Sequence, residues 1–277
     1  MLIGPDPTLG DEQSRMNLST QGQWNLYAPH RRKIEELIRP RRRGERLCVL
    51  GAGNCNDLDL TWLVEAFAEV HLVDIDPAAL ERAVARQGVS GHARLRLHAP
   101  FDLTAIAELT AGWKGRRVEE AEVDRAIEAA RSGEARVAEG GFDLVLSPCV
   151  LSQLWCGARD LVGKDHPKWP ALKTAIGARH VRTMTQSLGA NGRGVAIVDL
   201  TSTKSVPGLE RARPDEAAKV LEMSLGTGKY FKGLAPREMV EAFTLAGAKV
   251  CEVSAPWVWH LAWRKAFLCY GLTAGLT

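Results

Sequence analysis

The chain has 277 residues, of which 45% are hydrophobic and 25% charged, and its net charge is +3. This composition is typical of a globular protein with a sizeable core, in one large α/β domain or two small ones. The small net charge gives no support to a polyanionic partner, and no apolar run approaches the roughly 20 residues that cross a bilayer.

The six cysteines predict a reducing environment. None forms a C-x-x-C pair, and Cys48, Cys251 and Cys269 fall in apolar runs, where cysteine behaves as a small core residue. We therefore expect no disulfide framework, no metal site and a cytoplasmic location. Residues 1–10 lack the apolar segment of a signal peptide. The basic cluster at 39–43 is interpreted as a solvated loop, so neither nucleic acid nor a membrane is expected as a partner.

The first 44 residues stand apart from the regular pattern that follows them. Residues 1–20 are polar, and we expect the first dozen to be mobile. Between Gln23 and Ile38 the sequence predicts a short segment and then a helix that ends near Pro40.

After this segment, apolar strands alternate with amphipathic helices. Such alternation predicts βαβ units and a parallel sheet that is covered on both faces. The expected strands are 47–50, 69–73, 93–97, 142–146 and 194–199, and the expected helices between them are 57–67, 77–87 and 173–188.

Two later segments differ from this alternation. Residues 104–141 are rich in Ala, Glu and Arg, with helical periodicity and alternating charge, which predicts a solvent-facing helical insertion between strands three and four. The C-terminal part predicts a helix at 236–247 and then strands at 249–254 and 266–270, which would form an antiparallel edge. The glycine-punctuated stretch 224–233 is expected as a loop on the substrate side.

Polar residues or glycine follow each of the five expected parallel strands. Ligands of open α/β sheets bind in the crevice at these carboxyl ends, and packing alone does not explain polar residues at all five. The strands lead into Gly51–Cys55, Asp74, the loop 98–102, Ser147–Cys149 and Asp199.

The first of these loops argues against a dinucleotide. In G-x-G-x-x-G the third glycine allows close helix packing, with the pyrophosphate at the helix N-terminus. Asn56 occupies that position, and Asp57 and Asp59 would repel a pyrophosphate. An acidic loop favours S-adenosylmethionine, which carries a sulfonium and an ammonium but no phosphate. Asp74, about 20 residues beyond Gly53, is placed to accept the ribose hydroxyls.

Four motifs together resemble those of class I (Rossmann-like) S-adenosylmethionine-dependent methyltransferases, in order, over residues 45–270. They are V-L-G-A-G-N-C-N-D-L, V-H-L-V-D-I-D-P-A-A-L, the loop at Asp102, and F-D-L-V-L-S-P-C-V-L-S-Q-L. The resemblance implies a mostly parallel seven-stranded sheet with helices on both faces and an antiparallel edge strand at the C-terminus. It implies an N-terminal lid or substrate segment, 1–44, and a cofactor-binding domain, 45–277, that contains the insertion 104–141.

The resemblance also implies roles for individual residues. The glycine loop would line the methionine part of the cofactor, Asp74 would hold the ribose, Asp102 would contact the adenine, and the residues after strand four would border the methyl group. The implied cofactor-binding residues are Gly51, Ala52, Gly53, Asn54, Asp57, Asp74, Ile75, Phe101, Asp102, Ser147, Pro148 and Cys149.

Two positions depart from the family pattern. Val49 stands where an acidic residue is often found, and Cys55 stands at the third glycine of the G-x-G-x-G form. We interpret Asp57 as replacing part of the missing charge.

Structural interpretations of the same residues stay open. The glycine pair would then form only a tight turn, Asp102 would be a surface carboxylate, and Ser147-Pro148 would only turn the chain. Asp76 is a better candidate than Asp74 for capping the helix that starts at Pro77.

Methyl transfer needs an aligned nucleophile, exclusion of water and a base that accepts the proton of a hydroxyl or amine. His30 and Tyr27 are the preferred catalytic residues, because their segment precedes strand one, where many class I enzymes place a lid; a plain helix start is the alternative. His260 lies in a tryptophan-rich stretch, 257–263, which is either a core cluster or a substrate wall. The base candidates are His30, His166, His180, His260 and Asp199.

The sequence therefore predicts a methyltransferase that uses S-adenosylmethionine and modifies an oxygen or nitrogen of a small-molecule substrate. No D-P-P-Y or N-P-P-Y tetrad is present, which counts against methylation of DNA bases or protein glutamine. Two alternatives stay open. An RNA or protein methyltransferase would need a basic face, and a non-catalytic nucleoside-binding scaffold of the same fold would lack an open substrate crevice.

Overall fold

A single mixed sheet forms the centre of the structure, a computed structural model that describes residues 7–133, 135–137, 141–262 and 264–277. Within these residues the eight strands have the order β3-β2-β1-β4-β5-β8-β6, and β7 pairs with β8. The strands are β1 Arg46–Leu50, β2 Glu69–Val73, β3 Leu95–His98, β4 Phe142–Pro148, β5 Leu188–Ser202, β6 Ala248–Val253, β7 Trp257–Ala262 and β8 Lys265–Leu276.

The sheet confirms the Rossmann-like prediction. Strands β1 to β5 pair in parallel, and β8 runs antiparallel to β5, β6 and β7. The expected antiparallel C-terminal strand is β8, which lies between β5 and β6. Strand β7 was not expected. Its alternation of buried Trp257, Trp259 and Leu261 with exposed His260 and Ala262 is the pattern of a half-buried strand. Residue 263 lies outside the described residues.

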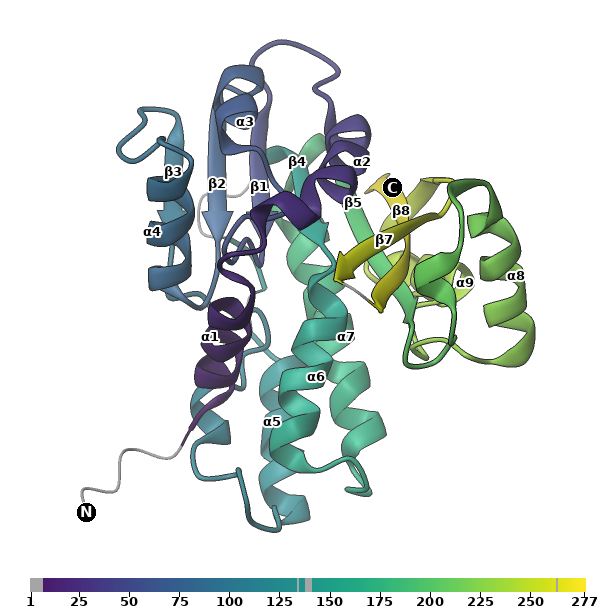
Figure 1. The fold of residues 1–277 in the computed structure, drawn as a ribbon. Coiled ribbons are helices and arrows are strands. Elements are labelled where there is room, and N and C mark those ends of the chain that lie inside the picture. Colours follow the sequence, from purple (N-terminus) through teal and green to yellow (C-terminus); the bar gives the residue numbers. More distant parts are fainter. Residues whose placement is uncertain (1–6, 134, 138–140, 263) are drawn as a thin grey trace.

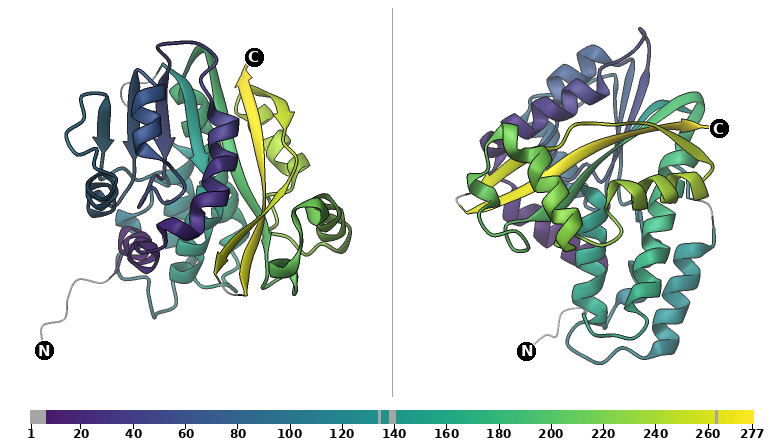
Figure 2. Two further views of the ribbon diagram at one scale, coloured as in Figure 1. Left: turned by 45° about the horizontal axis from the view of Figure 1, so that its top comes forward. Right: turned by 90° about the vertical axis from the view of Figure 1, so that its right-hand side faces the viewer.

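Helices cover both faces of the sheet (Figures 1 and 2). In the described part of the chain, none is both long and apolar enough to cross a membrane. Short 3-10 turns occur at η1 Trp24–Tyr27, η2 Glu108–Thr110, η3 Leu209–Arg211 and η4 Pro214–Glu216. The helices are α1 Leu9–Thr20, α2 Ala28–Ile38, α3 Leu60–Ala66, α4 Pro77–Arg86, α5 Glu120–Arg131, α6 Val150–Val162, α7 Trp169–Ser187, α8 Ala217–Thr227 and α9 Pro236–Leu245.

The alternation of side chains along β1 explains the two-sided core. Leu47 and Val49 are buried together with residues of α2, α3 and α4. Cys48 and Leu50 are buried in a second cluster with residues of α5, α6, α7 and α9. Burial of one such Leu or Val side chain contributes about 1.5–3 kcal/mol.

The segment 104–141 is less helical and less exposed than expected. Its only long helix in the described residues is α5, which packs against α7. Val123, Ala126 and Ile127 are buried on this face, and Trp113 is 1% exposed. The Ala residues thus contribute to a helix–helix interface, so the segment is not simply solvent-facing. Residues 134 and 138–140 lie outside the described part of the chain.

Helix α1 was not predicted. It begins within the dozen residues that we expected to be mobile, and a reciprocal capping box starts it: the Asp11 N–H donates to Thr8 Oγ1 at 3.3 Å and the Thr8 N–H to Asp11 Oδ2 at 2.7 Å. The helix crosses beside the carboxyl ends of the strands and contacts α4 and α6 (Figure 1). Residues 1–6 are outside the described range.

Candidate cofactor and substrate site

The glycine loop after β1 has a backbone that only glycine adopts easily. Gly51 has a φ of +69°, and a Cβ atom there would lie 2.5 Å from Cγ2 of Val150 at the start of α6. Gly53 has a φ of +49°, and its Cβ would lie 2.8 Å from Oδ1 of Asn17 on α1. The two glycines therefore do more than turn the chain, because they let it pass close to both helices.

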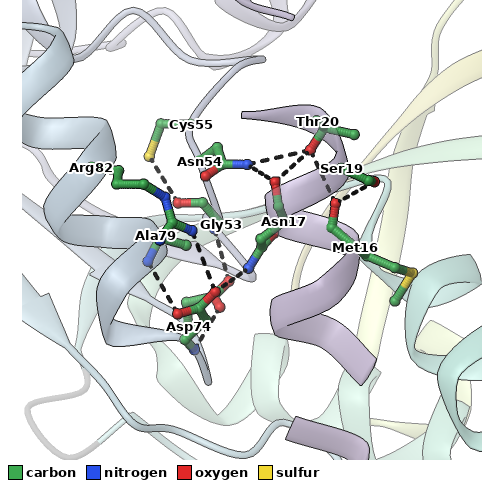
Figure 3. A network of polar contacts seen from close by, with 11 residues as sticks. Met16, Asn17, Ser19, Thr20, Gly53, Asn54, Cys55, Asp74, Ala79 and Arg82 are labelled. Atoms are coloured by element: carbon green, nitrogen blue, oxygen red, sulfur yellow. Dashed lines mark hydrogen bonds and ion pairs between the residues drawn. The ribbon is translucent and has the colours of Figure 1, made fainter. Parts of the chain in front are cut away.

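Asp74 at the end of β2 is bound to this loop. Its Oδ2 accepts a hydrogen bond from the Gly53 N–H at 2.7 Å, and its Oδ1 accepts one from the Asp76 N–H at 2.9 Å (Figure 3). Burial raises the pKa of Asp74 to about 6, against the lowering effect of these donors. Asp76 caps α4 by accepting from the Ala79 N–H at 3.1 Å, which confirms the predicted cap.

A small cavity of about 40 Å³ is lined by Asp74 and Gly51. The predicted residues Ile75, Phe101 and Asp102 line it together with Leu9, Gln13 and Asn17 of α1, which the sequence analysis did not identify. Asp102 also organises its own loop, since its oxygens accept from the N–H groups of Thr104 at 2.7 Å and Ala107 at 2.8 Å. Its contact with adenine stays a prediction.

A large cavity of about 730 Å³ extends from the glycine loop past Pro148 and Cys149 toward the C-terminal part of the sheet. The expected substrate-side stretch 224–233 contributes to it, although residues 224–227 belong to α8. The aromatic residues that line the cavity are Tyr27, Trp155, Trp169, Tyr230, Phe231, Trp259 and Phe267.

Two carboxylates line the inner part of this cavity. Helix α3 starts three residues later than expected because Asp59 caps it, accepting from the Trp62 N–H at 3.0 Å, so Asp57 lies in the loop and lines the cavity. Asp199 near the end of β5 accepts from Ser152 Oγ at 2.7 Å. Burial raises the pKa of both carboxyls to about 7. Such groups exchange protons near neutral pH.

Tyr27 and His30, the preferred catalytic residues, take different positions. Tyr27 lines the large cavity, whereas His30 is 1% exposed and is not among the lining residues. Its Nδ1 accepts from Trp257 Nε1 at 3.1 Å, and its ring stacks on Trp259 at 4.1 Å. Burial lowers the pKa of His30 to about 3. The structure thus places His30 behind the aromatic wall.

Ser147 is the one predicted cofactor residue that lines neither of these two cavities. Its hydroxyl pairs with His180 Nε2 at 2.7 Å beneath the crevice. His180, one of the base candidates, is 2% exposed and does not line the large cavity, and burial lowers its pKa to about 4.

Helix α1 separates the two cavities and is held by two asparagines of the glycine loop. Asn54 Nδ2 donates to the Asn17 carbonyl at 2.5 Å (Figure 3). Asn56 Nδ2 donates to the Thr20 carbonyl at 2.8 Å. Asn17 lines both cavities. The covering element beside the cofactor loop is therefore α1, whose only sequence signal was the spacing of Thr8 and Asp11.

The described residues contain no group of three or more His, Cys, Asp or Glu side chains that could hold a metal ion. All six cysteines are free thiols.

No protein-family model and no curated protein matches the sequence. Solved structures that resemble the chain include a putative methyltransferase from Haloferax volcanii in complex with the Trm112 methyltransferase activator. It is 13% identical, with 96% of this chain and 97% of that chain covered at a TM-score of 0.50. A TehB-like SAM-dependent methyltransferase from Corynebacterium glutamicum is 14% identical, with 95% and 100% covered at a TM-score of 0.48.

The Haloferax structure is matched along nearly its whole length, so the chain shares the fold of that protein. The predicted fold is thereby confirmed, since the structure that shares it is that of a putative methyltransferase.

Proposed function

We propose that this protein transfers a methyl group from S-adenosylmethionine to an oxygen or nitrogen of a small-molecule substrate. The observation that carries the proposal is the continuity of the site. Gly51 of the glycine loop lines both the small cavity beside Asp74 and the large cavity, which contains an ionisable carboxylate, Asp199.

The residues present fit the cofactor. Asp74 would accept the ribose hydroxyls, Ile75 and Phe101 would contact the adenine, and the backbone of Gly51–Gly53 would border the methionine part. Asp57 supplies a carboxylate beside this loop, where the cofactor's ammonium is expected. When bound, S-adenosylmethionine supplies a methyl carbon that its sulfonium has already activated.

Asp199 is the residue that we assign as general base. It lines the cavity, and its pKa of about 7 leaves it substantially ionised at neutral pH while still basic enough to accept a proton. Ser152 donates to one of its oxygens and so fixes the carboxylate, and the substrate hydroxyl or amine would transfer its proton to the other. Tyr27 would position the substrate from the opposite wall.

The size of the cavity supports a small-molecule substrate. Pockets for such ligands measure about 300–1,000 Å³, and 730 Å³ falls within this range. A non-catalytic scaffold would not need an open cavity of this size beside the glycine loop. The free thiols agree with a reducing cytoplasm.

The test is transfer of radioactive methyl groups from S-adenosylmethionine to pools of phenols and amines, with bulk RNA and denatured protein as parallel substrates. We expect the label in a small-molecule product, and none with Asp74→Ala. Label only in RNA or protein would refute the small-molecule assignment. Failure to bind the cofactor at all would refute the proposed activity.

A further inference from the structure

We propose that the methyl acceptor is an aromatic anion whose negative group is held by Lys173 and Lys232 at the outer part of the large cavity. This inference rests on the proposed function only in that it assigns the cavity to the acceptor.

The lining of the cavity contains more cationic than acidic side chains. Its acids, Asp57 and Asp199, belong to the loop after β1 and to β5, next to the cofactor loop and Ser152. Its cations come from five other places in the chain, and none of them forms an ion pair with a carboxylate in the described residues. They are Arg159 on α6, Lys173 on α7, Lys204 after β5, Lys232 after α8 and Lys265 on β8.

Lys173 is the most constrained of these cations. It is half-buried, and its Nζ lies 4.3 Å from the centroid of the Trp155 ring. The ammonium donates to the backbone carbonyl of Lys232, which leaves further N–H donors for a ligand. Burial lowers the pKa of Lys173, as expected for a cation without a counterion. Glu238, whose charge opposes this effect, already accepts from the N–H groups of Gly233 and Ala235 at 2.8 Å.

Lys232 brings a second ammonium to the same side of the cavity. Its Nζ lies 4.1 Å from the centroid of the Tyr230 ring, so both lysines are held against aromatic walls. Lys173 is half-buried and Lys232 is exposed. Two ammonium groups without an ion-pair partner attract an anion, and the attraction is stronger at the partly desolvated Lys173. A cationic acceptor would be repelled by the same pair.

The aromatic residues that line the cavity favour a planar ring as ligand. Only 6% of the residues of the chain are aromatic, whereas seven of the 30 residues that line the cavity are aromatic. Trp155 is fixed between two glycines: a Cβ at Gly177 would lie 3.1 Å from its Cζ2, and a Cβ at Gly233 would lie 2.9 Å from its Cη2. Such rigid rings bind aromatic ligands by offset or edge-to-face stacking. A ring would thus lie with its anionic group toward Lys173 and its nucleophile toward Asp199.

The test uses 6-hydroxy-2-naphthoate, its neutral amide, and 6-hydroxynaphthalene-2-sulfonate as fluorescent probes. The full chain is titrated with each probe, with and without S-adenosylhomocysteine, and the affinity for S-adenosylhomocysteine is measured in the same samples. The variant is Lys173→Gln/Lys232→Gln, and the matched control is Lys219→Gln/Lys249→Gln, which removes the same charge from exposed positions outside the cavity.

We expect the naphthoate to bind at least tenfold more tightly than the amide. The cavity variant should lose that preference while keeping its affinity for the amide and for S-adenosylhomocysteine, and the control should keep it. The sulfonate shows whether the lysines select a carboxylate or any anion. Equal binding of naphthoate and amide, absence of binding by both anions, or an equal loss in the control would overturn the inference. If the wild-type chain binds the naphthoate but not S-adenosylhomocysteine, the proposed function is refuted and the anion site still stands.

Discussion

At the scale of single residues, burial sets the chemistry of the site. Asp57 and Asp199 have ordinary side chains, but removal from water disfavours their charged forms and raises the pKa of each to about 7. The same effect acts in the opposite direction on His30, whose pKa is lowered to about 3. We therefore propose Asp199, and not His30, as the base.

The pH dependence of methyl transfer should report Asp199. A base acts in its ionised form, so kcat should rise with pH through an apparent pKa near 7 and then level off. Asp199→Asn keeps an acceptor for Ser152 but cannot take a proton, and we expect a loss of about 10²–10⁴ in kcat and a flat profile. Asp160→Asn, an exposed change on α6, is the control. An unchanged profile in Asp199→Asn would assign the base elsewhere.

Gly51 should tolerate no side chain. Gly51→Ala combines a positive φ with a contact of 2.5 Å to Val150, a β-branched residue fixed in α6. We expect a loss of about 1–3 kcal/mol in the free energy of unfolding and no measurable binding of S-adenosylhomocysteine. Gly226→Ala is the comparison, since nothing lies within 4 Å of its Cβ. Equal stability of the two variants in urea unfolding would contradict this explanation of the loop.

At the scale of elements, α1 covers the small cavity in which we propose that the adenosine binds. The cavity beneath it measures about 40 Å³, which holds a few water molecules but no adenosine. Binding of adenosine there, as we propose, requires the helix to shift, and the hydrogen bonds from Asn54 and Asn56 are among the contacts that hold its C-terminal half. Helix movements of this kind occur in microseconds to milliseconds.

Weakening this attachment should accelerate exchange of the cofactor. For Asn54→Ala/Asn56→Ala we expect dissociation of S-adenosylhomocysteine to become roughly tenfold faster. The corresponding change in activation free energy is about the net contribution of one or two hydrogen bonds. Stopped-flow fluorescence measures the rate, and the exposed Asn25→Ala serves as the control. A dissociation rate equal to that of the wild type would show that α1 does not limit exchange.

At the scale of the whole molecule, local patterns predicted the sheet and the glycine turn after β1. The runs at β1, β2 and β4 and the turn Gly51–Gly53 are continuous in sequence, and both periodicity and glycine spacing are visible there. The cap at Asp76 was also predictable, because capping depends on residues within one helical turn.

Features that depend on distant contacts were not predictable. Helix α1 is held by Asn54 and Asn56, more than thirty residues away in sequence. The position of His30 depends on Trp257 and Trp259, more than 220 residues further along the chain. The cavity itself combines α6, α7, β8 and the loop after α8, and no single segment carries its charge pattern.

The most direct measurement is calorimetric titration of the full chain with S-adenosylmethionine, S-adenosylhomocysteine and NAD, repeated with Asp74→Ala after its folding has been verified by thermal unfolding. The account predicts micromolar binding of the first two ligands, its loss in a folded Asp74→Ala variant, and no heat with NAD. Binding of NAD in place of the other two would show that the glycine loop serves a dinucleotide and would contradict the account.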